Sequence, residues 1–327
     1  MEQEYVLTLR GGKRRQWEDL IRAVDLTPGP EPDVTVLVWD GDRLAATGSR
    51  QGNILKYIAV DRDYQGQDLT ASVLTALRQD AFSRGMEHLF LYTKPKNGPM
   101  FTPLFFYPVA QTDDILLMEN VRDGVQSYLD TLPAGHTGTV GAAVMNCNPF
   151  TLGHRYLIET AARECDWLYV LVLAEEQGLF PAADRLELVR RGTADLKNVI
   201  VCSAGPYLIS SATFPDYFLR DRDHCEEAHC LLDVDIFVRH YAPRLGITRR
   251  YVGSEPLSPL TARYNEALLR HLPPHGIEVH VLPRRETAGT PISASAVRAL
   301  LGTHQPDRLR SLVPDTTFRY LEARQLI

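Results

Sequence analysis

The second half of the chain alternates apolar segments of strand length with helical stretches, and this order constrains the fold more than any other feature. Apolar runs of this length are typical of strands buried on both faces of a sheet, and helices between them allow the strands to run parallel. We therefore predict an α/β fold with a doubly wound parallel sheet for residues 131–327. The predicted strands are residues 139–146, 167–174, 198–204, 249–255 and 277–283.

The segment NPFTLGH, residues 148–154, follows the first predicted strand and leads into a helix. A helix N-terminus at the carboxyl edge of a parallel sheet attracts anions, because its first N–H groups are unpaired and the helix dipole is positive there. Gly153 would let a nucleotide approach the backbone, and His154 would donate to an α-phosphate oxygen. The alternative is a capped helix with an incidental histidine.

A second stretch, PISASAVRALL at residues 291–301, follows the last predicted strand. Ser293 or Ser295 is suited to cap a helix, whose free N–H groups would face the same anion. Arg298 carries a permanent charge and a forked set of donors suited to the β and γ phosphates. Taken alone, the stretch is equally typical of a capped amphipathic helix with a surface arginine.

Together, T-x-G-H after the first strand and I-S-x-S-x-V-R after the last resemble the paired signature of the nucleotidyltransferase superfamily. The resemblance implies catalytic roles for His154 and Arg298. Two weaker stretches extend it: Arg185, for which the alternative is an ion pair on a helix surface, and residues 253–255, which fit an ordinary turn equally well. The predicted ATP-binding residues are Asn148, Phe150, Thr151, Gly153, His154, Arg185, Gly253, Ser254, Glu255, Ile292, Ser293, Ser295 and Arg298.

Residues 1–130 have a different pattern, from which we predict a separate α+β domain. It contains a hairpin at Asp40-Gly41, a helix over residues 69–85, and strands at 5–10, 53–60, 88–94 and 113–120. This order resembles the GNAT acetyltransferase fold. A connecting helix within residues 121–138 leads to the second domain, and we place the boundary at residues 130 and 131.

In the GNAT family, a glycine-rich turn after the long strand binds the pyrophosphate of coenzyme A. The pattern Gln/Arg-x-x-Gly-x-Gly/Ala, aligned from Gln65, brings Asp68 and Thr70 to positions that small residues should occupy. A carboxylate there would repel a pyrophosphate, and both side chains fill space that glycine leaves open. We expect this domain to position or bind a partner; acetyl transfer from coenzyme A is the alternative.

Composition excludes several classes of partner. The formal net charge is -6, and Lys13–Arg15 is the largest basic cluster, so no nucleic acid partner is expected. No apolar run has membrane-spanning length and no basic leader begins the chain, so we expect a cytoplasmic protein without a membrane partner. The cysteines should be thiols, with Cys147 a small buried filler. The spacing of the cluster His224–Cys230 does not predict a metal site.

The resemblance extends over nearly the whole chain. The segments NPFTLGHRYLIE, FPAADRLELV, YLISSATFPDYF, YVGSEP, TARYN and PISASAVR occur in the order found in the citrate lyase ligase family. That resemblance implies an ATP-dependent acid-thiol ligase that uses Mg²⁺ and adenylates acetate. The acetyl group would then pass to the prosthetic thiol of the acyl carrier (gamma) subunit of citrate lyase, on its phosphoribosyl-dephospho-CoA group, with release of AMP and diphosphate.

In this mechanism His154 and the first helix would contact the α-phosphate, and Arg298 with the Ser293/Ser295 turn the departing pyrophosphate. Two alternatives remain. The same motifs serve enzymes that join AMP to a phosphate monoester, as in coenzyme A or dinucleotide synthesis, and a non-catalytic adaptor for a carrier protein would bind without chemistry. The loop at residues 207–218 could line the acyl pocket, receive the prosthetic arm or simply pack, so we predict no site role for it.

Overall fold

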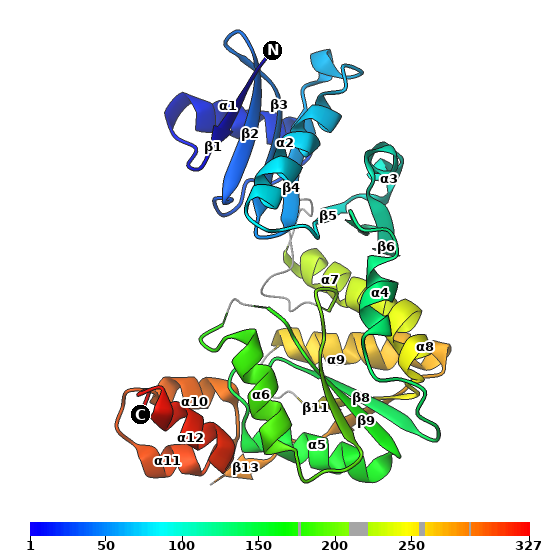
Figure 1. Cartoon of the computed structure of the whole chain (residues 1–327), viewed down its shortest axis with the longest axis vertical. Helices are drawn as coiled ribbons and strands as arrows, with labels where there is room; N and C mark the ends of the chain where they lie inside the picture. Colours follow the sequence, from blue (N-terminus) through cyan, green and yellow to red (C-terminus); the bar gives the residue numbers. More distant parts are fainter. Residues whose placement is uncertain (176–177, 209–221, 255–258, 288) are drawn as a thin grey trace. The chain divides into compact units, whose positions relative to one another are not determined.

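Figure 1 shows the computed structural model, which describes residues 1–175, 178–208, 222–254, 259–287 and 289–327. The described residues divide into two compact units. The first comprises residues 1–124 with residues 222–228, and the second comprises the rest of the described chain. The boundary at residues 130 and 131 stays a prediction.

The first unit contains a mixed seven-stranded sheet in the order β1-β2-β3-β4-β5-β7-β6. β4 and β5 are parallel, and the other neighbouring strands are antiparallel. The strands are β1 (Glu2–Val6), β2 (Val34–Asp40), β3 (Arg43–Gln51), β4 (Ile54–Val60), β5 (Phe90–Thr93), β6 (Tyr107–Gln111) and β7 (Leu116–Glu119). This α+β arrangement agrees with the predicted fold class.

Helix α2 (Leu69–Ser83) packs on this sheet through Val73 and Leu77, both fully buried. A Cβ atom at Gly48 of β3 would lie 2.4 Å from Val73, so the glycine permits the close approach. The predicted hairpin is present, and Gly41 adopts the positive φ of 58° that its turn requires. Short helical turns lie at Arg62–Tyr64, Pro95–Asn97, Gly98–Phe101 (α3) and Thr102–Leu104.

Three features of the first unit differ from the prediction. Strand β1 ends at Val6 rather than Arg10, because its pairing with β2 stops where Val6 meets Thr35. Helix α1 (Gly11–Ala23) was not predicted; it buries only Trp17, Leu20 and Ile21 of its thirteen residues. Strand β6 was also missed.

The second unit contains a five-stranded sheet in the order β10-β9-β8-β11-β12, with every neighbouring pair parallel. The predicted parallel sheet is therefore confirmed. β8 and β9 are buried along most of their length, as their apolar sequences predict. The strands are β8 (Val140–Met145), β9 (Trp167–Val172), β10 (Val199–Ser203), β11 (Arg249–Gly253) and β12 (Glu278–Leu282).

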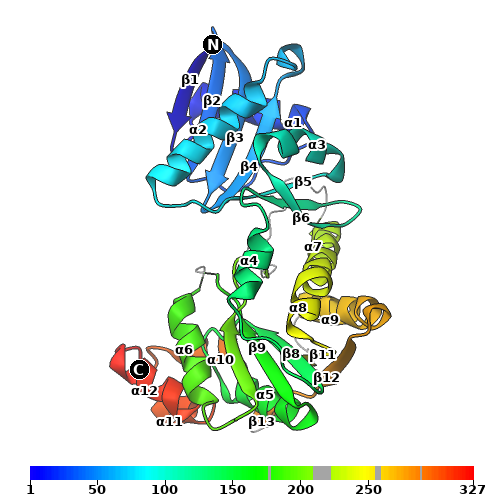
Figure 2. The same ribbon diagram turned by 45° about the vertical axis from the view of Figure 1, so that its right-hand side comes forward.

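Helices cover both faces of this sheet (Figure 2). On one face Tyr251 of β11 packs with Ile158 of α5 in a buried cluster. On the other, the neighbouring Arg250 lies against Phe237, in a π-helical turn that follows α7. The helical segments are α4 (Gly124–Asp130), α5 (Leu152–Glu164), α6 (Ala182–Gly192), α7 (Arg222–Ile236), the π-helical turn (Phe237–Tyr241), α8 (Ala242–Leu245), α9 (Pro259–His271) and the turn Pro273–His275.

The C-terminal segment forms a small helical cluster around Phe180, Val297 and Phe318. It consists of the two-residue strands β13 (Glu286–Thr287) and β14 (Thr290–Pro291), followed by α10 (Ala294–Leu300), α11 (Pro306–Arg310) and α12 (Asp315–Ala323). The segment between α11 and α12 contacts the start of α5, where Leu152 N–H donates to Leu312 O at 2.9 Å. Among the described helices, none combines the length and the apolar character needed to cross a membrane.

The strand order locates a binding site. β8 is central, with β9 on one side and β11 on the other, so the chain changes direction across the sheet between these strands. Ligands of open parallel sheets bind in the crevice at such a switch point, beyond the carboxyl ends of the strands.

Candidate active site

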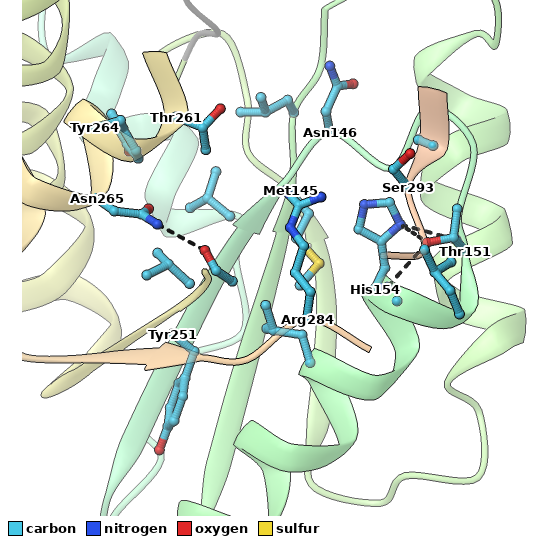
Figure 3. Close-up of a pocket in the computed structure, with 18 of the residues that line it drawn as sticks. Met145, Asn146, Thr151, His154, Tyr251, Thr261, Tyr264, Asn265, Arg284 and Ser293 are labelled. Atoms are coloured by element: carbon cyan, nitrogen blue, oxygen red, sulfur yellow. Dashed lines mark hydrogen bonds between the residues drawn. The ribbon is translucent and has the colours of Figure 1, made fainter. Parts of the chain in front are cut away.

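A cavity of about 690 Å³ lies at this switch point. Its walls come from the ends of β8 and β11, the start of α5, the segment after β12, the start of α10, and side chains of α7 and α9 (Figure 3). Eight of the predicted ATP-binding residues line it: Thr151, Gly153, His154, Gly253, Ile292, Ser293, Ser295 and Arg298. The two sequence motifs, which are separated by more than a hundred residues, thus share one cavity.

His154 is held by the residue that caps its own helix. Thr151 is the N-cap of α5 and accepts the His154 backbone N–H at 3.3 Å, while the Thr151 backbone N–H donates to His154 Nδ1 at 3.1 Å. This is a capping box in which histidine takes the place of the usual Glu or Gln. Since Nδ1 accepts a backbone N–H, the proton of the neutral ring must be on Nε2.

The surroundings of His154 favour its uncharged form. Burial, with a smaller contribution from the positive charge of Arg284, lowers the pKa of His154 from 6.5 to about 4. At neutral pH the ring is therefore a neutral Nε2–H donor in the cavity wall. An N–H group on Nε2 can make the predicted contact with a phosphate oxygen.

The start of α5 contributes one further donor. Leu152 N–H is used by Leu312 O, and His154 N–H by the Thr151 hydroxyl. Among the described residues no acceptor is present for the Gly153 N–H. The start of α5 therefore offers an anion fewer donors than predicted, namely the Gly153 N–H and the imidazole of His154.

Gly153 also joins the two motifs. A Cβ atom at this position would lie 2.9 Å from the backbone oxygen of Ile292, a distance that real Cβ atoms essentially never show. The prediction was that Gly153 makes room for a nucleotide. In the structure it also makes room for the chain that leads into α10.

Ser293 is the N-cap of α10, because its Oγ accepts the Ala296 N–H at 3.1 Å. Of the two serines predicted for this role, Ser295 instead lies in the first turn, exposed at the cavity. Arg298 donates through Nη1 to the backbone oxygen of Asn148 at 2.5 Å. The second motif therefore holds the first through Arg298 while its exposed guanidinium faces the cavity.

Arg185 does not line the cavity. It is buried, and its guanidinium donates to the backbone oxygens of Phe180, Asn146 and Glu175 and to the Asn146 side chain. The alternative of a helix-surface ion pair is wrong, because the side chain is only 1% exposed. In the structure Arg185 fixes the loops that follow β8 and β9.

Asn148 and Phe150 also lie behind the cavity wall. Asn148 accepts Arg298 through its backbone oxygen and Phe180 N–H through its side chain, at 3.3 Å. Phe150 is fully buried, with its ring nearly parallel to that of His154 at a centroid distance of 6.0 Å. Both residues position His154 and Arg298 in the structure; direct contact with ATP stays a prediction.

Sequence reasoning missed two arginines after β12. Arg284 and Arg285 both line the cavity, and Figure 3 shows Arg284 extending into it between Asn265 and His154. Arg284 is fixed by Ser254, whose backbone oxygen accepts its Nε at 2.8 Å and whose hydroxyl accepts its N–H at 3.3 Å. Two consecutive arginines at the carboxyl end of a predicted parallel strand were the available signal.

Ser254 does not line the cavity; its contact with Arg284 is its observed role. Glu255, also predicted to bind ATP, lies outside the described residues. The loop at residues 207–218, for which the sequence predicts no site role, lies outside them from residue 209 to 218.

The charges of the lining are strongly asymmetric. Four arginines line the cavity (Arg250, Arg284, Arg285 and Arg298), and Asp233 is the acidic residue among the described lining residues. The whole chain has a net charge of -6, so this concentration of positive charge is local. Such a cavity favours polyanions and carboxylates.

Cys147 is buried in the core and does not line the cavity, and burial raises the pKa of its thiol, so it is a packing residue as predicted. His229 and Cys230 of α7 are buried and line the cavity. In the part of the chain that the structure describes, no group of three metal-ligating side chains is present.

The first unit has a cavity of its own, of about 750 Å³. It is lined by residues of the predicted coenzyme A turn, including Gln65, Asp68 and Thr70, and by Lys56. Asp68 precedes α2 in the left-handed conformation and makes no capping hydrogen bond with its side chain. Its carboxylate therefore stands at the helix start where a pyrophosphate would bind, and weak binding of coenzyme A stays a prediction.

Comparisons with known proteins agree with the paired motifs. The family model described as the citrate lyase ligase C-terminal domain matches residues 140–321. The chain is 39% identical to the citrate (pro-3S)-lyase ligase of Klebsiella pneumoniae over 324 residues, which covers 97% of this chain and 95% of the relative. It is 37% identical to the corresponding ligase of Escherichia coli K12 over 308 residues, covering 91% and 87%.

A shorter match is found with phosphopantetheine adenylyltransferase of Corynebacterium efficiens, 39% identical over 69 residues, covering 20% of this chain and 43% of that protein. Among solved structures, Thermotoga maritima TmcAL bound with alpha-thio ATP matches with a TM-score of 0.38 and 16% identity, covering 57% of this chain and 56% of that one. Escherichia coli ElaA matches with a TM-score of 0.33 and 14% identity, covering 37% and 100%.

Proposed function

Because the chain belongs to the citrate lyase ligase family, we propose that it activates citrate lyase in an ATP-dependent reaction and that the cavity at the β8–β11 switch point is its active site. In this reaction the cavity adenylates acetate. The acetyl group then passes to the prosthetic thiol of the acyl carrier subunit of the lyase. The cytoplasm is the proposed location.

The observation that carries this proposal is the state of His154. Its Nδ1 atom accepts the Thr151 N–H, and its lowered pKa keeps the ring neutral, so Nε2–H is a fixed donor in a cavity lined by four arginines. A preorganised donor of this kind stabilises the negative charge that develops on phosphoryl oxygens in the transition state.

In the first step, one acetate oxygen forms a bond to the α-phosphorus of ATP. The bond between that phosphorus and the bridging oxygen to the β-phosphate breaks, and pyrophosphate leaves with the electron pair. We assign His154 and the Gly153 N–H to the α-phosphate, and Arg298 to the leaving pyrophosphate. Arg284, which the sequence reasoning did not include, lies close enough to His154 to lower its pKa and is a further candidate for phosphate contact.

In the second step, the carrier thiolate attacks the carbonyl carbon of the acetyl-adenylate, and AMP leaves. The attacking sulfur belongs to the carrier, so the enzyme needs no nucleophile of its own. This agrees with the burial of Cys147 away from the cavity. Water must be kept from the mixed anhydride until the carrier thiolate attacks.

Mg²⁺ is proposed to enter with ATP as part of the substrate. Asp233, the acidic residue among the described lining residues, accepts the hydroxyl of Tyr264 at 2.5 Å. The described residues thus offer no carboxylate cluster of the kind that holds Mg²⁺ by itself, and the nucleotide phosphates would be its ligands.

The adenylation of a phosphate monoester is less well supported. Phosphopantetheine adenylyltransferase aligns with 20% of this chain, whereas the citrate lyase ligase of Klebsiella pneumoniae aligns with 97%. The shared part therefore supports common nucleotide chemistry, and the full-length match supports the ligase. A non-catalytic adaptor would not require the neutral, oriented histidine.

Trapping of the intermediate tests the proposal. ATP, Mg²⁺ and acetate with hydroxylamine, but without carrier, should give acetohydroxamate together with AMP, because the first step requires no thiol. Cys147→Ser should retain this activity. Formation of ADP, or of an acetylated Cys147 on the kinetic pathway, would contradict the mechanism. A phosphomonoester-dependent enzyme would form no hydroxamate from acetate.

A further inference from the structure

The active-site cavity contains a buried cation that the proposed phosphate contacts do not use. Arg250 lies on β11 and lines the cavity although only 2% of the residue is exposed. Its Nε and Nη1 atoms are buried and have no hydrogen-bond partner among the described residues. Buried guanidinium groups are normally paired, because desolvation of an unpaired charge is unfavourable.

The neighbours of Arg250 hold its side chain without satisfying it. The guanidinium carbon lies 4.6 Å from the centre of the Phe237 ring, in the π-helical turn. Stacking on an aromatic ring covers one face of the guanidinium and leaves its in-plane N–H groups available. Asp233, the nearby acidic lining residue, accepts a hydrogen bond from Tyr264.

The position of Arg250 in the sheet separates it from the phosphate contacts. Arg250 pairs with Ala142 of β8, and side chains two residues further along a strand lie on the same face. On this face, towards the carboxyl edge, Val144 and Val252 line the cavity. His154 and Arg298 come from α5 and α10, and α5 packs on the opposite face with Tyr251.

The chemistry of this region selects the class of ligand. A planar, forked, permanently charged donor matches a carboxylate, which accepts two parallel N–H groups. The valine side chains offer an apolar wall to the short hydrocarbon part of a small acid. The triphosphate already has donors elsewhere in the cavity. The anion that pairs with the Arg250 guanidinium is therefore the carboxylate substrate.

We infer that Arg250 is the binding residue for the carboxylate substrate, a small monocarboxylate, and orients its free oxygen towards the α-phosphorus. This assignment rests on the proposed adenylation of a carboxylate. It explains why the buried guanidinium of Arg250 in the cavity wall has no hydrogen-bond partner at Nε and Nη1 among the described residues. It also adds a residue that neither sequence motif contains.

The test compares the affinity for acetate with the affinity for ATP in Arg250→Met and Arg250→Gln. Acetate-dependent exchange of labelled pyrophosphate into ATP gives the KM for acetate, and calorimetry with a non-hydrolysable ATP analogue gives the nucleotide Kd. Loss of a charged hydrogen-bond partner should raise the KM for acetate about tenfold to a hundredfold. The nucleotide Kd should stay within about threefold of the wild-type value.

Arg249→Gln is the matched control. Arg249 precedes Arg250 on β11, does not line the cavity, and pairs with Glu278 at 3.1 Å on the surface. The same substitution there should leave both constants unchanged. Acetate should also raise the Tm of the wild-type protein and of Arg249→Gln, compared with chloride at equal ionic strength, but not the Tm of the Arg250 variants.

The outcomes separate the two hypotheses. If the wild-type protein shows no acetate-dependent exchange, the proposed function fails. If the wild-type protein exchanges and either Arg250 variant keeps the wild-type KM for acetate, the carboxylate assignment is overturned. It is also overturned if the nucleotide Kd rises as much as the KM for acetate. Should the methionine variant not fold, the glutamine variant decides, because its side chain keeps polar atoms at this position.

Discussion

The backbone N–H of Thr151 donates to Nδ1 of His154 at 3.1 Å, and the two residues cap the same helix in both directions. The cap therefore has two effects. It gives the backbone N–H groups of Thr151 and His154 hydrogen-bond acceptors at the start of α5. It also orients the imidazole of His154 with its proton on Nε2. Residues 151–154 therefore both start the helix and supply the imidazole of the site.

The first prediction concerns the protonation of His154. A base whose folded pKa lies near 4, below its ordinary 6.5, stays neutral in the folded protein at pH 5.5. The neutral form stabilises the fold above pH 6.5, and this contribution is lost as the pH falls from 6.5 towards 4. Nitrogen-15 NMR of histidine-labelled protein should show one ring, absent in His154→Asn, with a proton on Nε2 alone at pH 5.5.

The same ring in urea-denatured protein should be mostly protonated at this pH, which is the control. A doubly protonated His154 ring in the folded protein at pH 5.5, or a proton on Nδ1, would contradict the capping geometry.

The second prediction concerns the two donors of the paired motifs. His154→Ala and Arg298→Ala should each lower kcat for acetate-dependent hydroxamate formation by about two to four orders of magnitude, because each removes a donor to developing phosphoryl charge. Steady-state kinetics measures the loss, and circular dichroism checks the fold. His275→Ala and Arg308→Ala, which change exposed residues outside the cavity, are the controls. Near-normal turnover in both motif variants would refute the assignment.

The parallel sheet could be predicted because its signal is physical and local. Strands such as β8 and β9 must be apolar on both faces. The capping box of α5 lies within four consecutive residues, 151–154. Helix α1 escaped prediction because only three of its residues are buried, so its apolar stripe is short. Strand β6 contains Pro108, which normally counts against a strand and is tolerated here at the sheet edge.

The site could be predicted only where its residues belong to a contiguous motif. Thr151, His154 and Arg298 were found in this way and line one cavity. Arg250 could not, because nothing in its neighbours along the chain distinguishes a buried, cavity-lining arginine from a surface one, and for Arg284 the only signal was its place in a pair of arginines after a predicted strand. The place of Arg250 follows from the face of β11 on which it lies, and that of Arg284 from its hydrogen bond to Ser254. Both are properties of the folded chain.

The third prediction separates positioning from binding at Arg185. Arg185→Met should lower the free energy of unfolding by about 3–5 kcal/mol, because it leaves several buried carbonyl groups without their donor. Urea denaturation measures the change. Arg191→Met, on the exposed side of the same helix, should have little effect. A variant with wild-type stability and a raised Kd for ATP would show instead that Arg185 binds the nucleotide.

The fourth prediction concerns the cavity of the first unit. Calorimetry of the whole protein with acetyl-CoA should give no binding tighter than about 100 μM, since the carboxylate of Asp68 stands at the start of α2. Asp68→Gly should bind more tightly, because it removes the charge and tolerates the left-handed conformation of that residue. Micromolar binding by the unchanged protein would show that the altered turn still accepts coenzyme A.

The last prediction concerns the contact that joins the two motifs. In Gly153→Ala the new methyl group would lie 2.9 Å from the Ile292 backbone oxygen, so the chain leading into α10 must move. This displaces Ser293 and Arg298 relative to His154. A misplacement of this order in an active site lowers kcat/KM about tenfold to a hundredfold.

The measurement is kcat/KM for ATP in hydroxamate formation, with Gly12→Ala as the control. A Cβ atom at Gly12 meets no atom within 4 Å, so the same substitution there introduces no clash. Because the displaced element carries the pyrophosphate contact, the Gly153 variant should also lose most of the further effect of Arg298→Ala. A double variant whose loss equals the product of the two single losses would mean that Gly153 and Arg298 act independently, and that the approach of α10 to α5 does not assemble the site.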